Sequence, residues 1–217
     1  MKTSRRNTLA LLTGLAVATA LGLFQISVGG PTSAKADPPD PTGRAPRISP
    51  RPGLLGSDLK AILDHAEATA NATDSGLRGG FKTKMHIAVV DRDGQLLAVR
   101  SMPDAWVGSF DIAIAKARTA AFFSSDQNAL TSRVIGNLSQ PGQPLWGIGN
   151  SNQIGISGGP EFRNGIITFP GGVPLYKSGR LVGGVGVSGD GVDQDEHVAF
   201  GGAAGFEPPA GISKLGF

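Results

Sequence analysis

Apolar residues early in the folded region repeat with the spacing of a helix. Five of them fall at i, i+3, i+4, i+7 and i+11: Leu59, Ile62, Leu63, Ala66 and Ala70. This spacing places their side chains on one face. Ser57 comes just before them and is a favourable N-cap residue. We therefore expect an amphipathic helix that begins near Ser57.

Short apolar runs bounded by turn residues predict the strands. Five such runs are present: 84–91, 95–100, 166–169, 173–176 and 181–187. The first two are joined by Arg92-Asp93-Gly94, which indicates a hairpin, and the last two by the tight turn Lys177-Ser178-Gly179-Arg180. We expect one antiparallel sheet of about five strands.

Further helices are expected on either side of these strands. One begins at Ser109 and ends near Phe123, residues 128–138 continue helically, and a last helix covers about 194–204. The helix after Ser109 is apolar nearly all round, so it is expected to be buried on more than one side. The fold class is therefore α/β, with helices packed on the faces of the sheet in a profilin-like layout.

The segment 169–196 is unusually rich in glycine. Glycine in a strand interior lowers stability, so several together indicate close backbone approach, either to another chain or to a ligand. Four glycines of this segment are candidate cofactor contacts: Gly171, Gly172, Gly184 and Gly186. We also expect the glycine-rich strand and the apolar helix to become buried in a homo-oligomer.

Residues 1–36 form a candidate export signal. Lys2, Arg5 and Arg6 precede an apolar run, and Ala34-Lys35-Ala36 has the small-x-small pattern of a cleavage site. The paired arginines resemble a twin-arginine signal. We expect a secreted or periplasmic protein with no membrane span after cleavage. An uncleaved membrane anchor is the alternative, because the apolar run is almost long enough to span.

The rest of the chain divides into a linker and one domain. Residues 37–53 contain six prolines and predict a stiff, extended linker. Residues 54–217 are enough for one domain with a hydrophobic core. Within that domain, residues 139–165 predict a long loop, which at this length is functional or part of an interface.

Charge and cysteine content exclude several function classes. Four basic residues and no acidic ones lie in 1–36, which leaves 16 basic against 17 acidic residues, a net charge near −1. The mature chain therefore has no basic footprint for nucleic acid. The sequence contains no cysteine, which excludes disulfides, covalent c-type haem attachment and thiolate metal sites.

Two short motifs match enzyme patterns without the surrounding structure that those patterns need. Residues 184–189 match GxGxxG, but no second parallel strand is predicted after them to complete a dinucleotide site. Residues 155–159 match GxSxG, but the segment is loop-like rather than a strand followed by a helix. Both are better explained as glycine-rich structural segments.

The densest acidic group precedes His197: Asp190, Asp193, Asp195 and Glu196. Helix capping explains it, with Asp193 as N-cap and the acids that follow favoured by the helix dipole. The alternative is a hard-cation or iron site, in which Asp193, Glu196, His197 and the more distant His65 are candidate metal ligands.

Three blocks of the chain together resemble a known family. They are HIAVVDRDGQLLAV (86–99), IAIAKARTAAFF (112–123) and FPGGVPLYKSGRLVGGVGVSGDGVDQDE (169–196). In this order they resemble the GlcG/HbpS family of small haem-associated proteins, the haem-degrading (DUF336) domain, from about residue 59 to 205. The resemblance implies a homo-oligomer and noncovalent binding of haem or iron.

The resemblance also assigns site residues. The setting of His65 looks like the helix that carries a haem- or metal-proximal histidine in relatives, so His65 is the candidate axial ligand. Haem-binding relatives place a threonine at the haem edge, four residues after the position of Phe123. Here that residue is Gln127, which can donate and accept hydrogen bonds but is a poor iron ligand.

These observations favour an exported haem- or iron-binding accessory protein that works in sequestration or sensing. One alternative is an enzyme for a small organic acid or aldehyde, with His65, the acidic group and residues 139–165 around its pocket. Another is a structural partner of an exported redox complex. No set of residues in the sequence supports a defined catalytic mechanism.

Overall fold

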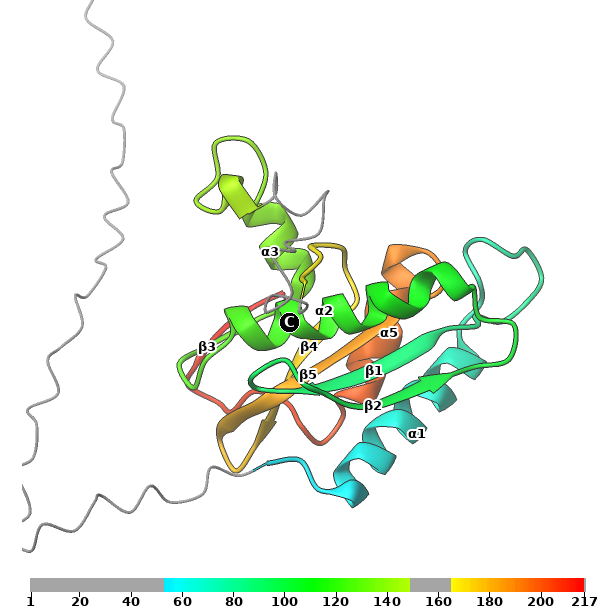
Figure 1. Cartoon of the computed structure of the whole chain (residues 1–217), viewed down its shortest axis with the longest axis horizontal. Coiled ribbons are helices and arrows are strands. Elements are labelled where there is room, and N and C mark those ends of the chain that lie inside the picture. The colour runs from blue at the N-terminus through cyan, green and yellow to red at the C-terminus, as the bar shows by residue number, and fades with distance from the viewer. Residues whose placement is uncertain (1–52, 149–164, 217) are drawn as a thin grey trace, which may run out of the picture. The chain divides into compact units, whose positions relative to one another are not determined.

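Four strands form one antiparallel sheet in the order β2-β1-β5-β4 (Figure 1). The computed structural model describes residues 53–148 and 165–216. The strands of this sheet are β1 (His86–Asp91), β2 (Leu96–Ser101), β4 (Gly172–Lys177) and β5 (Arg180–Ser188). A separate parallel pair joins β3 (Asn128–Leu130) to β6 (Ser213–Leu215).

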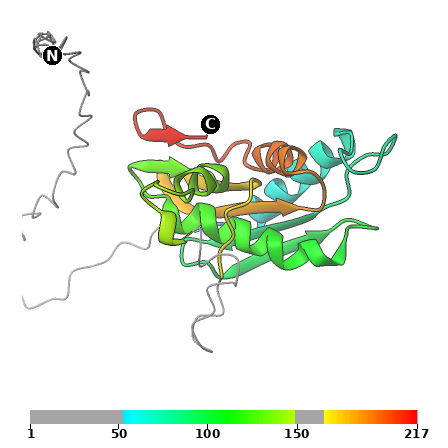
Figure 2. The same ribbon diagram turned by 90° about the horizontal axis from the view of Figure 1, so that it is seen from above.

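Helices cover both faces of the sheet (Figure 2). Their bounds are α1 (Gly56–Ala72), α2 (Phe110–Phe123), α3 (Ser132–Leu138) and α5 (Val192–Gly202), with a short 3-10 helix η1 (Val107–Ser109) before α2. Helices α1 and α5 lie on one face and α2 lies on the other. None of the helices within 53–148 and 165–216 is both long and apolar enough to cross a membrane.

Alternate side chains of the sheet pack against the two helical layers. Ile87 and Val89 of β1 belong to the core with α1 and α5, whereas Ala88 and Val90 belong to the cluster with α2. This alternation follows from the two-residue period of a strand. Burial of each Ile or Val side chain contributes about 1.5–3 kcal/mol, so packing against both layers of helices stabilises the sheet.

The two expected hairpins are confirmed. Strand β1 pairs with β2, and β4 pairs with β5. Ser178 has φ 52° and Gly179 has φ 74°, the positive pair that a type I′ turn requires. In the other hairpin, Gly94 has φ 80° and lies in the loop between Asp91 and Leu96, where glycine adopts this conformation without a steric cost.

Helix α2 lies directly on the glycines of the sheet. A Cβ atom at Gly184 would lie 2.4 Å from the carbonyl oxygen of Ala117, and one at Gly186 would lie 2.0 Å from that of Ala113. A Cβ at Gly172 would lie 2.2 Å from the carbonyl oxygen of Lys116. The close approach that the glycines indicate is therefore made by α2 of the same chain, not by a ligand or a second chain.

Three expected elements differ from the structure. Residues 166–169 form no strand, so the sheet has four strands rather than about five. The backbone of Ile167 is instead held by the hydroxyl of Thr119, which donates to its carbonyl and accepts from its N–H. Helix α5 begins at Val192, two residues before the predicted start.

Residues 128–138 are not one helix. Residues 128–130 form strand β3, and helix α3 begins only at Ser132. Thr131 has extended backbone angles and its side chain accepts a hydrogen bond from the N–H of Val134. It is therefore the N-cap of α3, and an N-cap residue cannot continue a helix from the residues before it.

Candidate functional site

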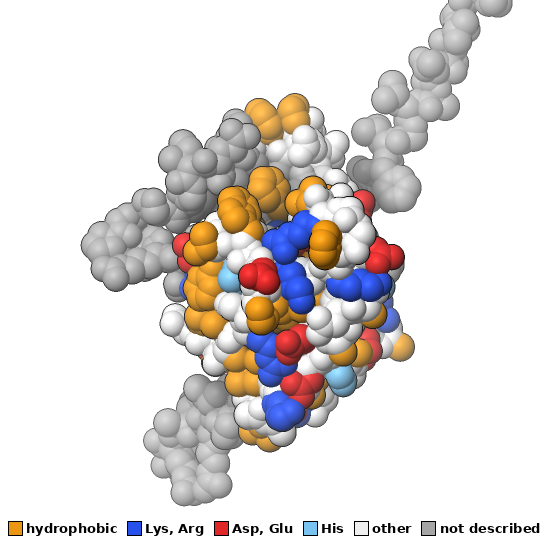
Figure 3. Space-filling view, turned by 90° about the vertical axis from the view of Figure 1, so that its right-hand side faces the viewer, with side chains coloured by type: hydrophobic (Ala, Val, Ile, Leu, Met, Phe, Trp, Pro, Cys, Tyr) orange, Lys and Arg blue, Asp and Glu red, His pale blue; other side chains and the backbone are white. Residues whose placement is uncertain are grey.

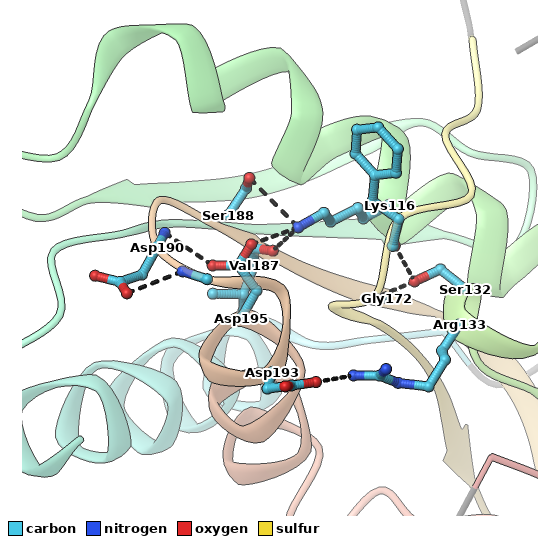
Figure 4. Close-up of polar contacts among 11 residues, drawn as sticks. Lys116, Ser132, Arg133, Gly172, Val187, Ser188, Asp190, Asp193 and Asp195 are labelled. Atoms are coloured by element: carbon cyan, nitrogen blue, oxygen red, sulfur yellow. Dashed lines mark hydrogen bonds and ion pairs between the residues drawn. The ribbon is translucent and has the colours of Figure 1, made fainter. Parts of the chain in front are cut away.

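A buried ion pair joins the two helical layers at one end of the sheet (Figure 4). Lys116 of α2 and Asp195 of α5 approach to 2.6 Å, and their side chains are 1% and 3% exposed. The Lys116 ammonium also donates to the carbonyl oxygen of Val187 and lies 3.4 Å from the hydroxyl of Ser188. Each of its three protons therefore has an acceptor within reach.

Burial and attraction act in opposite directions on this pair. Burial lowers the pKa of Lys116 and raises the pKa of Asp195, while the attraction between the two groups opposes both changes. Burial prevails because both side chains are almost completely removed from water, so the pKa of Lys116 lies below its ordinary value and the pKa of Asp195 lies above it. The pair is thus costly to break, since either charge left alone would be buried without a partner.

Two glycines leave room for the lysine side chain to cross the end of the sheet. Gly171 has φ 118°, and a Cβ there would lie 3.0 Å from the Cβ of Asp195 and 3.1 Å from the ammonium of Lys116. The next residue, Gly172, lies under the backbone of α2 and donates its N–H to the hydroxyl of Ser132. Both glycines therefore have a packing role around the ion pair.

A second set of contacts joins α3 to α5. The guanidinium of Arg133 donates to Asp193 at 2.6 Å and to Glu196 at 2.5 Å. The capping prediction for Asp193 is wrong, because the N-cap of α5 is Gly191 and Asp193 lies in the first turn. Its carboxylate instead pairs with Arg133 and interacts favourably with the positive, N-terminal end of the helix dipole of α5.

The structure does not support a metal site made by the four predicted ligands. Asp193 and Glu196 both bind Arg133, and His65 and His197 are exposed on different helices. Within 53–148 and 165–216, no three histidine or acidic side chains converge so as to hold a metal ion. The positive guanidinium of Arg133 already compensates the negative charges of Asp193 and Glu196, so these carboxylates attract a cation less strongly.

His65 and Gln127, the two residues assigned by resemblance, are not brought together. His65 is exposed on α1, which packs on the α5 side of the sheet. Gln127 is exposed in the turn after α2, which covers the other face, and its N–H donates to the hydroxyl of Ser125. A role for Gln127 beside a ligand of His65 stays a prediction.

The two enzyme motifs have different outcomes. The first two GxGxxG glycines belong to β5 and the third, Gly189, follows its end. Strand β5 lies between two antiparallel neighbours and so lacks the parallel unit of a dinucleotide site. The glycine-rich structural interpretation explains Gly184 and Gly186, since α2 occupies the space beside them. The GxSxG motif at 155–159 lies outside the described residues.

Sequence reasoning missed the partners of Lys116 and Arg133. One signal for the first was present: Lys116 lies in a helix in which Ala113, Ala117 and Ala120 face the interior. A lysine surrounded by small buried residues is expected to have a buried acidic partner. Nothing in the sequence indicates that Asp195, rather than one of its acidic neighbours, is that partner.

Sequence comparisons place the chain among small proteins and domains of related sequence. A family model described as haem degrading protein HbpS-like matches residues 57–204. An uncharacterized 15.0 kDa protein from the dhaT-dhaS intergenic region of Citrobacter freundii is 37% identical over 112 residues, which cover 52% of this chain and 68% of that protein. The corrinoid adenosyltransferase PduO of Citrobacter freundii is 35% identical over 113 residues, but the match spans only 29% of its length.

Solved structures agree with this relationship. The chain matches PduOC in a complex with haem, with 27% identity and a TM-score of 0.55, over 70% of this chain and 94% of that one. It matches the Klebsiella pneumoniae protein ORFY with 27% identity and a TM-score of 0.57, over 75% and 97%. HbpS, at 22% identity and a TM-score of 0.52, shares the fold. The family model covers well over half of the chain, and the chain therefore belongs to the HbpS-like family of haem degrading proteins.

Proposed function

We propose that this protein binds haem noncovalently outside the cytoplasm, where it sequesters or senses haem. The observation that carries the proposal is the match to the haem complex of PduOC, which extends over 94% of that chain. Membership of a haem degrading family supports it further. Because the sequence has no cysteine, covalent c-type attachment is excluded and the haem must be held by coordination and packing.

The family resemblance selects His65 as the axial ligand over the equally exposed His197. The ring of His65 makes no hydrogen bond or ion pair within the described residues, and it is exposed on α1. His86 is buried, with Nδ1 2.8 Å from the hydroxyl of Ser101 and Nε2 3.0 Å from the carbonyl oxygen of Trp106. His197 is exposed on α5 and provides a matched control. When haem is bound, its iron supplies the coordination chemistry, and neutral imidazole is a standard ligand for it.

A haem titration tests this proposal. The purified protein should show saturable binding with a new Soret absorption. His65→Ala should shift or abolish that absorption, whereas His197→Ala should leave it unchanged. If the wild-type protein shows no saturable binding, the proposed function is wrong. If binding is tight and indifferent to His65, haem binding stands and the ligand assignment fails.

Export is part of the proposal and rests on the sequence of residues 1–36. Replacing Arg5 and Arg6 by lysine should trap the precursor inside the cell, because a twin-arginine signal requires both arginines. Sequencing the exported protein should find Asp37 at its N-terminus. Normal export of the double variant would contradict the twin-arginine route, and an intact Met1 would contradict cleavage.

We further propose a closed homo-oligomer. The glycine-rich strand no longer supports it, since α2 covers that strand within the chain. Support comes instead from Leu96 and Leu97 of the edge strand β2 and from Phe122 of α2, which are exposed apolar residues. Sedimentation should show one closed assembly, and a monodisperse monomer at micromolar concentration would exclude it.

A further inference from the structure

A surface pocket lies at the end of the sheet where β1 begins and β2 ends. Its volume is about 570 Å³. Two loops line it, one between α1 and β1 and the other after β2; the lining residues are Arg78, Gly79, Phe81, Lys82, Lys84 and Asp104. Figure 3 shows this side of the molecule, where Lys and Arg side chains gather beside acidic and apolar ones. None of these residues belongs to the proposed haem ligands.

The pocket is built from segments that are fixed to the rest of the fold. The guanidinium of Arg78 donates to the carbonyl oxygen of Asp104 at 3.0 Å and so joins the two loops. The N–H of Ser75 donates to the carbonyl of Phe81, and Asp190 accepts hydrogen bonds from Ser75 and from the N–H of Gly76. The loop before β1 is therefore held at both its start and its end.

The loop after β2 is anchored by a buried histidine. Nε2 of His86 lies 3.0 Å from the carbonyl oxygen of Trp106, and since a carbonyl only accepts, this nitrogen carries the proton. Nδ1 lies 2.8 Å from the hydroxyl of Ser101. Trp106 follows Asp104 by two residues, so His86 limits the movement of the second wall of the pocket.

The charges of the lining favour an anion. Three cations, Arg78, Lys82 and Lys84, stand against the single carboxylate of Asp104. The ammonium of Lys82 donates to the carbonyl oxygen of Ala72 at 3.0 Å and pairs with Asp74, but that carboxylate is 89% exposed and such pairs are weak. The ammonium of Lys84 has no hydrogen bond or ion pair within the described residues, so it is available to a ligand.

Phe81 adds an aromatic wall. Its side chain is 70% exposed although its backbone is fixed by hydrogen bonds to Ser75 and Arg78. A single exposed phenylalanine is ordinary. Phe81, whose backbone is fixed and which lies beside three cations, forms part of a binding surface. A flat apolar group can lie against its ring while an anionic group binds the ammonium of Lys84.

Asp104 is the acidic residue among those that line the pocket. It lies at a backbone position that glycine usually occupies. The N–H of Ala105 donates to the carbonyl of Met102, which closes a turn with Pro103 and Asp104 at its centre. Asp104 has φ 64°, and a turn of this kind ordinarily takes glycine there. The carboxylate is therefore not required by the turn, and it repels an anion bound in the pocket.

We propose that this pocket binds a molecule in which a carboxylate is attached to a flat apolar body. The inference does not depend on His65, and of the two sources named next only the haem propionate rests on the proposed haem function. Two sources share this chemistry: a propionate of haem, and a free aromatic acid. The carboxylate pairs with Lys84, with Arg78 and Lys82 nearby, while the apolar body lies against Phe81.

The test uses 2-naphthoate and its neutral counterpart, 2-naphthalenemethanol, with the full-length protein in calorimetric titrations. Naphthoate should bind more tightly than the alcohol. Lys84→Gln should lower the affinity for naphthoate about tenfold, as expected for one lost hydrogen bond to a charged group. The same variant should leave the affinity for the alcohol unchanged. Asp104→Asn should raise the affinity for naphthoate, because it removes the carboxylate that repels a bound anion. Lys214→Gln, at an exposed residue of β6, is the control and should have no effect.

Equal affinity for the acid and the alcohol would overturn the proposal, as would equal effects of Lys84→Gln and Lys214→Gln. The source is then identified by competition. If haem displaces naphthoate and haem dimethyl ester does not, the pocket receives a propionate. If naphthoate binds the haem-loaded protein unchanged, the pocket serves a separate acid. Failure of haem to bind would remove the proposed function while the naphthoate titration still tests the pocket.

Discussion

The ammonium of Lys116 lies 2.6 Å from the carboxylate of Asp195 and joins helices that cover opposite faces of the sheet. Removing two charges from water costs several kcal/mol for each, and the contact offsets that cost only while both partners are present. Because of this pair, the packing of α2 on the sheet depends on the packing of α5, and the packing of α5 depends on that of α2.

Breaking this pair from one side should destabilise the protein strongly. Lys116→Met and Asp195→Asn should each lower the free energy of unfolding by about 3–5 kcal/mol, because each leaves one buried charge unpaired or poorly paired. The double variant should lose less than the sum of the two. Urea unfolding measures all three. Lys60→Met, which breaks an exposed pair with Asp64, should change little. Small, additive losses at Lys116 and Asp195 would contradict the coupling.

Adding one methyl group under α2 should also be costly. Gly186→Ala would place a Cβ 2.0 Å from the carbonyl oxygen of Ala113, which is backbone and cannot rotate away. We expect a loss of about 1–3 kcal/mol in urea unfolding, the usual range for overpacking. Gly56→Ala is the matched control, since nothing lies within 4 Å of the added atom. Equal stability of the two variants would show that α2 does not lie against β5.

Acid should weaken the contact between Asp190 and the loop after α1. Burial by itself raises the pKa of Asp190, but hydrogen bonds from Ser75 and from the N–H groups of Gly191, Gly76 and Leu77 outweigh it, and the pKa lies below 3.8. A lowered pKa contributes stability above pH 3.8 that is lost as the pH falls through the folded-state value.

Comparison of the wild type with Asp190→Asn isolates this contribution. The difference in unfolding free energy should be constant near neutral pH and should shrink below about pH 4. Other acids with lowered pKa values, Asp58 and Asp64, titrate in both proteins and cancel in the difference. A difference that stays unchanged in acid would show that Asp190 is not ionised in its hydrogen-bonded state.

The single tyrosine of the chain offers a direct optical titration. The Tyr176 hydroxyl lies 2.8 Å from the carbonyl oxygen of Ser125 and 3.0 Å from that of Asn128, and burial raises its pKa to about 12. Because the folded-state pKa is raised, its contribution to stability is complete below pH 10.0 and is lost as the pH rises towards about 12.

Near-ultraviolet absorbance should therefore show no tyrosinate in the folded protein at about pH 10, where half of a fully exposed tyrosine is ionised. The urea-unfolded protein should ionise with its midpoint there, and Tyr176→Phe should remove the signal. An ordinary midpoint in the folded protein would mean that the hydroxyl is open to water.

Local patterns predicted the elements whose causes are local. The periodicity of α1 correctly identified Ile62, Leu63, Ala66 and Ala70 as buried, and the turn at Ser178 and Gly179 indicated the β4–β5 hairpin. Residues 166–169 have a strand-like composition. They form no strand because Thr119, 48 positions away, binds the backbone of Ile167.

The candidate site was less predictable because its contacts join distant positions. Lys116 and Asp195 are 79 residues apart, and nothing near either one in sequence identifies the other. The glycines of β5 indicated a close backbone approach, but sequence alone could not distinguish a ligand from a helix of the same chain. The family resemblance predicted the fold correctly, and its assignments of His65 and Gln127 stay predictions.

The contact between α2 and the glycines of β5 has a consequence for the order of folding. Glycine loses more backbone entropy than other residues when it enters a strand, and Gly183, Gly184 and Gly186 bring no side chain to compensate. Strand β5 is thus a poor nucleus, although it lies between β1 and β4 and holds the sheet together. We infer that it becomes ordered only as α2 docks, so that helix and sheet centre form in a single cooperative step.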